Sequence, residues 1–298
     1  MKKKIWILIL TFILIRKSSL VEALENDKYE RIMKQDILSL MMAYPEYICE
    51  LNKESNGKVY VIMKSGRKIL YDDKKEKSFE EKIANPDLQD MMEQIYPLCI
   101  SEKLMDKNFD PGRGRVYPLL MEVYGSSNKE VEGNLVSVKG LRFNNKNKAG
   151  ESLRKVMEEL IPLAKNSGKI SSCVFPYSGT FNYRYIAGTN RLSPHAFGIA
   201  IDLARDKRDY WKWATREEGE KRIGSYPKEI VEIFEKNNFI WGGKWGHFDI
   251  LHFEYRPEII MKAKYFGGHH KEDVLWYEGL NSEDDNIKYL IEKIDASL

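Results

Sequence analysis

Two short stretches in the second half of the chain combine residue types that bind divalent metals. The first, Ser-Pro-His-Ala-Phe-Gly-Ile-Ala-Ile-Asp, contains His195 and Asp202, and the second is Asp-Ile-Leu-His, from Asp249 to His252. Two imidazoles and one carboxylate form a zinc site with an open fourth position, and a second carboxylate nearby can take a proton from the attacking water. The pattern predicts a catalytic zinc centre, and the alternative is a set of hydrogen-bonded core histidines.

An apolar run before Asp202 predicts that this carboxylate lies in a buried strand. Residues 199–201 are Ile-Ala-Ile, and Leu203 follows Asp202. A buried carboxylate is costly unless it meets a cation or strong donors, so we expect such a partner at Asp202. Gly198 allows the backbone to bend, which would fold His195 back toward Asp202.

The spacing of Asp249 and His252 predicts where a second strand begins. Strict alternation along one strand would place these two side chains on opposite faces of a sheet. A strand that begins near Leu251, with Asp249 on the turn before it, removes the conflict. Asp249 would then lean over a metal held by His252.

Helical and strand patterns are interspersed along the chain without the regular spacing of a parallel α/β fold, which favours an α+β class. Residues 126–132 are polar and flanked by glycine, so they are the best candidate for a linker or an excursion from the fold. Helices are predicted over residues 29–42, 85–97, 150–166 and 226–234, a hairpin over 58–71, and strands over 198–204, 239–241 and 251–255.

The motifs together resemble the zinc D,L-peptidases of bacterial cell walls, which include D-Ala-D-Ala carboxypeptidases of the vancomycin-resistance type and L-Ala-D-Glu endopeptidases of phage lysins. The resemblance rests on Ser-x-His-x-x-Gly-x-Ala-x-Asp at 193–202, Asp-x-x-His at 249–252 and Trp-Gly-Gly-x-Trp at 241–245, and it covers roughly residues 140–257. It implies a small antiparallel sheet with flanking helices.

The predicted domains follow from this coverage. Residues 1–23 form a signal peptide or anchor, residues 24–130 an N-terminal α/β extension of unknown role, and residues 131–298 the zinc peptidase-like catalytic domain.

Carried over position by position, the resemblance implies that Zn²⁺ is bound by His195, Asp202 and His252, with Asp249 as the general base. The implied reaction is direct hydrolysis of a peptidoglycan stem peptide without an acyl-enzyme. D-alanyl-D-alanine carboxypeptidase activity is the first expectation. The alternatives are L-Ala-D-Glu type endopeptidase activity, amidase activity at the glycan–peptide link, and a catalytically silent module that binds the wall or a protein partner.

Relatives also use an arginine that binds the substrate carbonyl. Arg184 is the favoured counterpart, and Arg191 is its rival because it lies nearer to the ligand histidine. Glu254 shares strand parity with His252, so it supports the ligands or pairs with Arg256. The candidates for substrate contact or ligand support are Arg191, Ser193, Trp245, His247 and Glu254.

The charge balance argues against a nucleic-acid binder and toward export. The 48 Lys and Arg against 45 Asp and Glu leave a net charge of +3. Residues 1–23 hold five of the basic residues and one acidic residue, so the rest is close to neutral. Lys2–Lys4 precede an apolar run over residues 5–15, which predicts a signal peptide and a periplasmic or extracellular protein. An uncleaved membrane anchor is the alternative.

Export to an oxidising compartment would allow a disulfide among the three cysteines. Cys49 and Cys99 are the favoured pair because Cys173 lies near the predicted site. Three buried thiols are the alternative.

Overall fold

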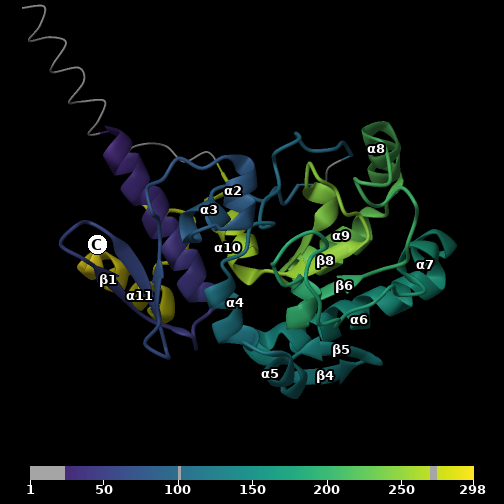
Figure 1. Ribbon diagram of the computed structural model, residues 1–298, viewed down its shortest axis with the longest axis horizontal. Coiled ribbons are helices and arrows are strands. Elements are labelled where there is room, and N and C mark those ends of the chain that lie inside the picture. Colours follow the sequence, from purple (N-terminus) through teal and green to yellow (C-terminus); the bar gives the residue numbers. More distant parts are fainter. Residues whose placement is uncertain (1–23, 100–101, 269–273) are drawn as a thin grey trace, which may run out of the picture.

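The computed structural model describes residues 24–99, 102–268 and 274–298, so the predicted export segment over residues 1–23 lies outside the described residues. Within the described residues, no helix is both long and apolar enough to cross a membrane. The combination of helices with small antiparallel sheets confirms the predicted α+β class (Figure 1).

The N-terminal part is a helix and a small antiparallel meander. The described part of the helix covers residues 24–43, and two short helices follow the meander. The predicted hairpin is confirmed, but a preceding strand joins it, and the helix predicted over residues 85–97 is shorter. These elements are β1 (Ile48–Lys53), β2 (Val59–Met63), β3 (Lys68–Leu70), α2 (Phe79–Ala84) and α3 (Leu88–Met92).

The middle of the chain connects this part to the central sheet. Most of the segment predicted as a linker or an excursion, residues 126–132, is the helix α5 rather than an irregular loop. Ser127 caps that helix by accepting from the Glu130 amide at 3.3 Å, and Val131 is buried. The elements are α4 (Tyr117–Tyr124), α5 (Asn128–Gly133), the hairpin β4 (Leu135–Val138) and β5 (Leu141–Asn144), α6 (Ala149–Asn166) and α7 (Gly168–Val174).

A three-stranded antiparallel sheet in the order β6-β8-β7 positions the predicted site. Its register places Asp202 opposite His252 and Ala200 opposite Glu254. All three strands were predicted within a few residues. The elements of this part are β6 (Ala200–Asp202), α8 (Arg216–Ser225), α9 (Lys228–Lys236), β7 (Phe239–Trp241), β8 (His252–Tyr255), α10 (Pro257–Phe266) and α11 (Asp285–Ser297), with short 3₁₀ turns η1 (Lys146–Lys148), η2 (Pro194–Phe197) and η3 (Gly242–Lys244).

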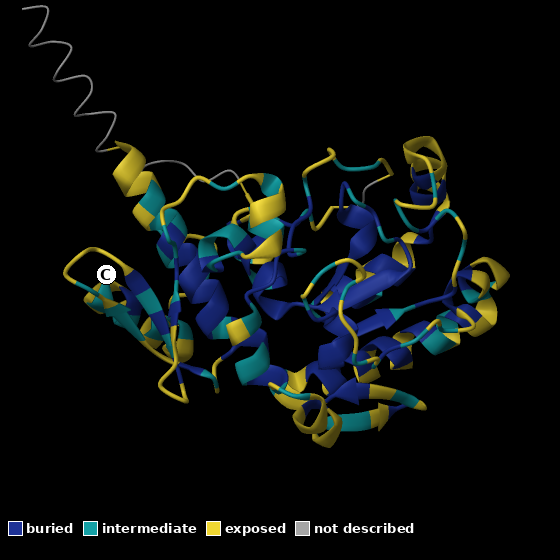
Figure 2. Cartoon of the chain, viewed as in Figure 1, coloured by how far each residue is buried: buried dark blue, intermediate teal, exposed yellow. Residues whose placement is uncertain are grey.

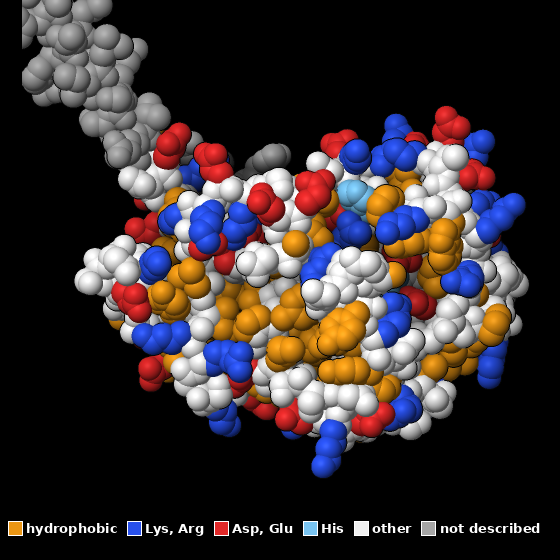
Figure 3. Space-filling model, viewed as in Figure 1, with side chains coloured by type: hydrophobic (Ala, Val, Ile, Leu, Met, Phe, Trp, Pro, Cys, Tyr) orange, Lys and Arg blue, Asp and Glu red, His pale blue; other side chains and the backbone are white. Residues whose placement is uncertain are grey.

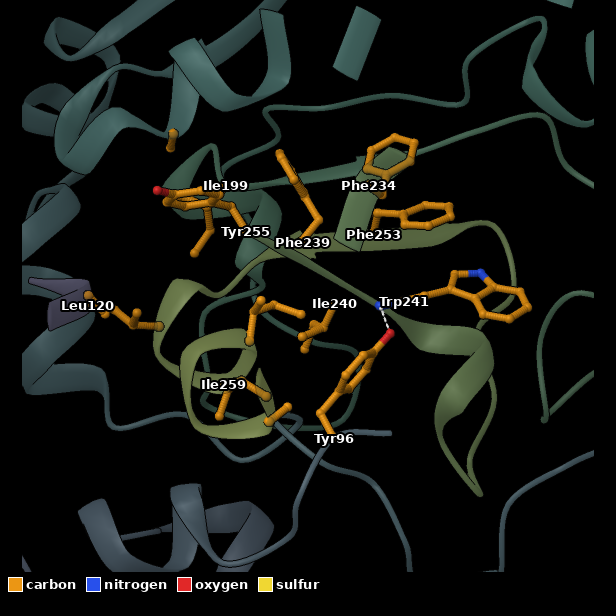
Figure 4. Packing of buried hydrophobic residues seen from close by; sticks show 14 of the residues in the cluster. Tyr96, Leu120, Ile199, Phe234, Phe239, Ile240, Trp241, Phe253, Tyr255 and Ile259 are labelled. Atoms are coloured by element: carbon orange, nitrogen blue, oxygen red, sulfur yellow. Dashed lines mark hydrogen bonds between the residues drawn. The ribbon is translucent and has the colours of Figure 1, made fainter. Parts of the chain in front are cut away.

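Aromatic packing holds this sheet between elements from both halves of the chain. The rings of Phe234 on α9 and Phe253 on β8 stack with centroids 3.9 Å apart, and Tyr96 reaches in from the N-terminal part, where its hydroxyl accepts from the Trp241 amide at 2.9 Å (Figure 4). The central strands are among the most buried parts of the molecule (Figure 2). One continuous core therefore fixes the sheet against the N-terminal part.

The predicted disulfide is wrong, because all three cysteines, which lie in the described part of the chain, are free. Cys49 is on β1 beside α11, where its carbonyl accepts from Lys293. Cys99 is exposed and lines a different cavity next to Trp241. Cys49 and Cys99 therefore lie in different parts of the structure. Cys173 is buried, as expected of a packed thiol.

Candidate metal centre

Three predicted ligand side chains converge beside the central sheet. The Oδ1 atom of Asp202 lies 2.9 Å from Nδ1 of His252 and 3.2 Å from Nε2 of His195. One ligand atom from each residue lies within 4.8 Å of the others. Asp202 is less buried than predicted, with its side chain 25 % exposed, because it faces a cavity. The partners expected for its carboxylate are the two imidazoles.

The turn η2 orients His195 toward this group. The Ser193 hydroxyl accepts from the His195 amide at 3.3 Å and starts the turn. Gly198 ends it in the left-handed region at φ 67°, where a Cβ would lie only 2.7 Å from a methyl carbon of Leu135. On the ring, Nδ1 donates to the Thr180 carbonyl at 2.6 Å, so Nε2 keeps its lone pair for a metal.

The strand β8 carries the other imidazole, His252, which faces Asp202 with Nδ1, whereas His195 faces it with Nε2. His252 turns Nδ1 toward Asp202, and its Nε2 faces a carboxylate oxygen of Glu254 at 3.7 Å. Glu254 is fully buried, and both its oxygens accept from Arg115. The two alternatives predicted for Glu254 coexist, since it lies behind a predicted ligand and also meets Arg256 at 3.5 Å.

Charge complementarity within the cluster is strong. Burial by itself would raise the pKa of Asp202, but the two histidines hold it well below its usual range. Burial would lower the pKa of His252, but its contacts with Asp202 and Glu254 raise it to about 10. Both shifts have the same cause, which is the attraction between the imidazoles and the carboxylates, and this attraction favours a positive charge at the position of His252.

Asp249 lies on the turn before β8, as the spacing predicted. The His252 amide donates to the Asp249 carbonyl at 3.1 Å, which defines this turn. Burial raises the pKa of the Asp249 carboxyl to about 7, and the neighbouring charges of Asp202 and Asp209 add to this effect. A carboxyl with this pKa on the cavity wall has the properties of a general base near neutral pH.

The cluster opens into a cavity of about 410 Å³ that also contains Asp249. Lysine and arginine side chains contribute much of its lining, although basic and acidic groups mix over the outer face shown in Figure 3. A cavity with this lining favours a ligand that carries a carboxylate. The basic residues are Arg113, Arg115, Arg184, Arg191, Arg205 and Lys212.

Both candidate arginines for the substrate carbonyl line this cavity. Arg184 is exposed, and its own carbonyl accepts from the Ser193 amide at 2.9 Å. Arg191 is partly buried, and its guanidinium donates to the Ile83 carbonyl. Arg184 thus has the greater freedom to reach a substrate, and the choice between the two arginines stays a prediction.

His247 lines the same cavity, and its neighbours fix the orientation of its ring. Its Nδ1 lies 2.8 Å from a carboxylate oxygen of Asp110, and its amide donates to the other oxygen at 3.0 Å. The ring stacks on Phe79 with centroids 5.5 Å apart. Trp245 also lines the cavity, with its indole nitrogen donating to the Pro111 carbonyl at 2.9 Å.

Three residues that contact this site come from the N-terminal half and were missed. Asp110 begins the sequence Asp-Pro-Gly, which is typical of a turn, and Arg113 and Arg115 follow directly after it. Asp110 pairs with Arg113 at 2.5 Å and with His247. The one local signal was two arginines directly after a turn, which also suits an exposed loop.

The donor set fits a catalytic zinc site. Two imidazoles whose other ring nitrogens face hydrogen-bond acceptors, together with one carboxylate, supply three protein ligands. A second acidic group, Asp72, Asp73 and Asp87, also has ligand atoms close together. There the ammonium of Lys77 pairs with Asp73 and Asp87, so this group already has its cation.

This α+β fold brings a donor set that fits a divalent metal to a basic cavity. Residues 187–255 match the family model described as D-alanyl-D-alanine carboxypeptidase. The match confirms the predicted resemblance for this segment, about a quarter of the chain, which contains the three predicted ligands and Asp249. No curated protein and no solved structure matches the chain.

Proposed function

We propose that this protein is an exported zinc-dependent peptidase that hydrolyses peptidoglycan stem peptides as a D-alanyl-D-alanine carboxypeptidase. The observation that carries the proposal is the convergence of His195, Asp202 and His252 within 4.8 Å on a cavity that Asp249 also lines. The family match supports the peptidase class. The basic lining suits a peptide that ends in a free carboxylate.

Zinc held by the three ligands would activate a water and polarise the scissile carbonyl. Asp249 accepts the proton of the attacking water and returns it to the leaving amine. It can do so only as a carboxylate, and a cation bound beside it lowers its pKa from about 7 toward that form. Arg184, or Arg191 in its place, donates to the substrate carbonyl, and such a donor contributes about 3–4 kcal/mol to transition-state stabilisation.

The test is digestion of a defined stem pentapeptide that ends in D-Ala-D-Ala, with products identified by mass spectrometry. We expect release of one D-Ala, loss of activity after chelation, and recovery with Zn²⁺. Full activity in a verified metal-free preparation would overturn zinc dependence. Cleavage between L-Ala and D-Glu would identify the endopeptidase instead. A zinc-loaded protein that binds the peptide without cleaving it would be the silent binding module.

Export is the part of the proposal that depends on residues 1–23. The lysines followed by an apolar run support it, as does a substrate that lies outside the cytoplasmic membrane. Mass measurement of the protein recovered from its native compartment tests it, because removal of the segment leaves a chain that begins near residue 24.

A further inference from the structure

A buried arginine from the N-terminal half, Arg115, forms a two-bond ion pair with Glu254, the carboxylate next to the predicted ligand His252. Arg115 donates from Nε to Oε1 of Glu254 at 2.8 Å and from Nη2 to Oε2 at 2.5 Å. Glu254 is fully buried, and Arg115 is 6 % exposed. This two-bond geometry fixes the plane of the carboxylate as well as its position.

Glu254 faces one ring nitrogen of His252, and Asp202 faces the other. His252 and Glu254 share one face of β8 because they are two residues apart on the strand. Nε2 of His252 lies 3.7 Å from Oε2 of Glu254, while Nδ1 lies 2.9 Å from Asp202. The two carboxylates therefore define which ring nitrogen is available to a metal.

Arg115 is itself held in place by the N-terminal part of the molecule. Its Nη1 donates to the Arg113 carbonyl at 2.9 Å. Beside it, Arg256 pairs with Glu258 at 2.6 Å, and Glu258 accepts from the hydroxyl of Tyr44 at 2.8 Å. The support behind His252 thus continues to Tyr44, the residue directly after the N-terminal helix.

We propose that Arg115 and Glu254 are positioning residues for His252, so that the N-terminal part of the chain belongs to the metal centre. The inference rests on the proposed zinc function. It gives a role to residues before 131, which lie outside the segment that matches the peptidase family. In this role the negative charge of Glu254, 3.7 Å from Nε2, favours the proton on that nitrogen, which leaves the Nδ1 lone pair directed toward the metal.

A purely structural role makes a different prediction. Removing one member of a buried pair leaves an uncompensated charge and destabilises the fold, whereas replacing both with apolar residues of similar size is often neutral or stabilising. The double variant Arg115→Met/Glu254→Leu therefore separates the two roles. It removes the carboxylate behind His252 without leaving its charged partner unpaired.

The experiment measures Zn²⁺ affinity by competition with a chelator on the full chain, together with thermal unfolding of the metal-free protein. The variants are Glu254→Gln, Arg115→Lys and the double variant. Arg142→Met/Glu132→Leu is the matched control, because this pair is exposed and 3.8 Å apart. We expect 10–100-fold weaker zinc binding in the double variant. Glu254→Gln and Arg115→Lys should show smaller losses, and the control should bind zinc as the wild type does.

The variants test the positioning role of Arg115 and Glu254, and zinc binding by the wild type tests the proposed function. A folded double variant that binds zinc within twofold of wild type overturns the inference. If the double variant does not fold, Glu254→Gln decides, because an unchanged zinc affinity in that near-isosteric variant also overturns it. A wild-type protein that binds no zinc refutes the proposed function itself, and this result is read before any variant is compared.

Discussion

Gly242 and Asp249 touch through their backbones. The Asp249 amide donates to the Gly242 carbonyl at 2.9 Å, and a Cβ on Gly242 would lie 2.5 Å from the Asp249 carbonyl oxygen and 3.2 Å from the Asp249 Cβ. No side chain fits there without a shift of backbone. The glycine after Trp241 thus allows the turn that places the predicted base on the cavity wall.

Gly242→Ala should displace Asp249 and reduce kcat by about tenfold or more. Zinc binding should change less, because the substitution reaches the ligand His252 only through the Asp249 carbonyl. Steady-state kinetics and metal analysis of the purified variant check this. Gly168→Ala is the matched control, since a Cβ there meets nothing within 4 Å. An active Gly242→Ala enzyme would mean that the position of Asp249 is not critical.

Asp249→Asn and His195→Ala should fail in different ways. The first keeps the ligands and loses the proton acceptor, so we expect normal zinc content with kcat lowered about 10²–10⁴-fold. The second removes a ligand, so we expect loss of bound zinc at micromolar concentrations. Metal content measured beside turnover checks both variants. Substantial turnover by zinc-loaded Asp249→Asn would show that another group accepts the proton.

The local parts of the site could be predicted because each had a local pattern. The Ile-Ala-Ile run indicated the strand that ends at Asp202, and Gly198 indicated the bend that returns His195. The three-residue spacing to His252 placed Asp249 on a turn. Each of these inferences concerned residues within about ten positions of one another.

The long-range parts had no such signal. Arg115 and Glu254 are 139 residues apart, and only the folded core brings them together. Polar composition over residues 126–132 looked like a linker, because a residue such as Ser127 suits both a loop and a helix cap. The pairing of Cys49 with Cys99 failed for the same reason, since the distance between them in space is not encoded in their spacing.

Zinc affinity should rise with pH. Contacts with Asp202 and Glu254 raise the pKa of His252 from 6.5 to about 10 despite its burial, so it carries a proton in the metal-free protein at neutral pH. A metal must displace that proton, so affinity should increase about tenfold per pH unit between pH 6 and 8. Calorimetric titration in two buffers of different ionisation enthalpy should show release of at least one proton. Zinc binding without proton release would contradict this prediction.

The same proton should stabilise the metal-free fold. Because the pKa is raised on folding, the contribution is fully present below pH 6.5 and is lost as the pH rises toward 10. Thermal unfolding of the metal-free protein across this range should therefore show a fall that His252→Gln removes. A fall of the same size in that variant would assign the effect to other groups.

Asp110→Asn should impair catalysis without loss of metal. Asp110 holds His247 through both the ring and the backbone, and it also pairs with Arg113, so three contacts at the cavity wall depend on one carboxylate. Weakening charge-assisted hydrogen bonds of this kind costs about 1.5–3 kcal/mol, which corresponds to a roughly ten- to hundredfold lower kcat/KM. Zinc affinity should stay within twofold because Asp110 contacts none of the three ligands. Asp285→Asn, on the exposed first turn of α11, is the control and should be neutral. Unchanged kcat/KM in Asp110→Asn would show that His247 lines the cavity without taking part in the reaction.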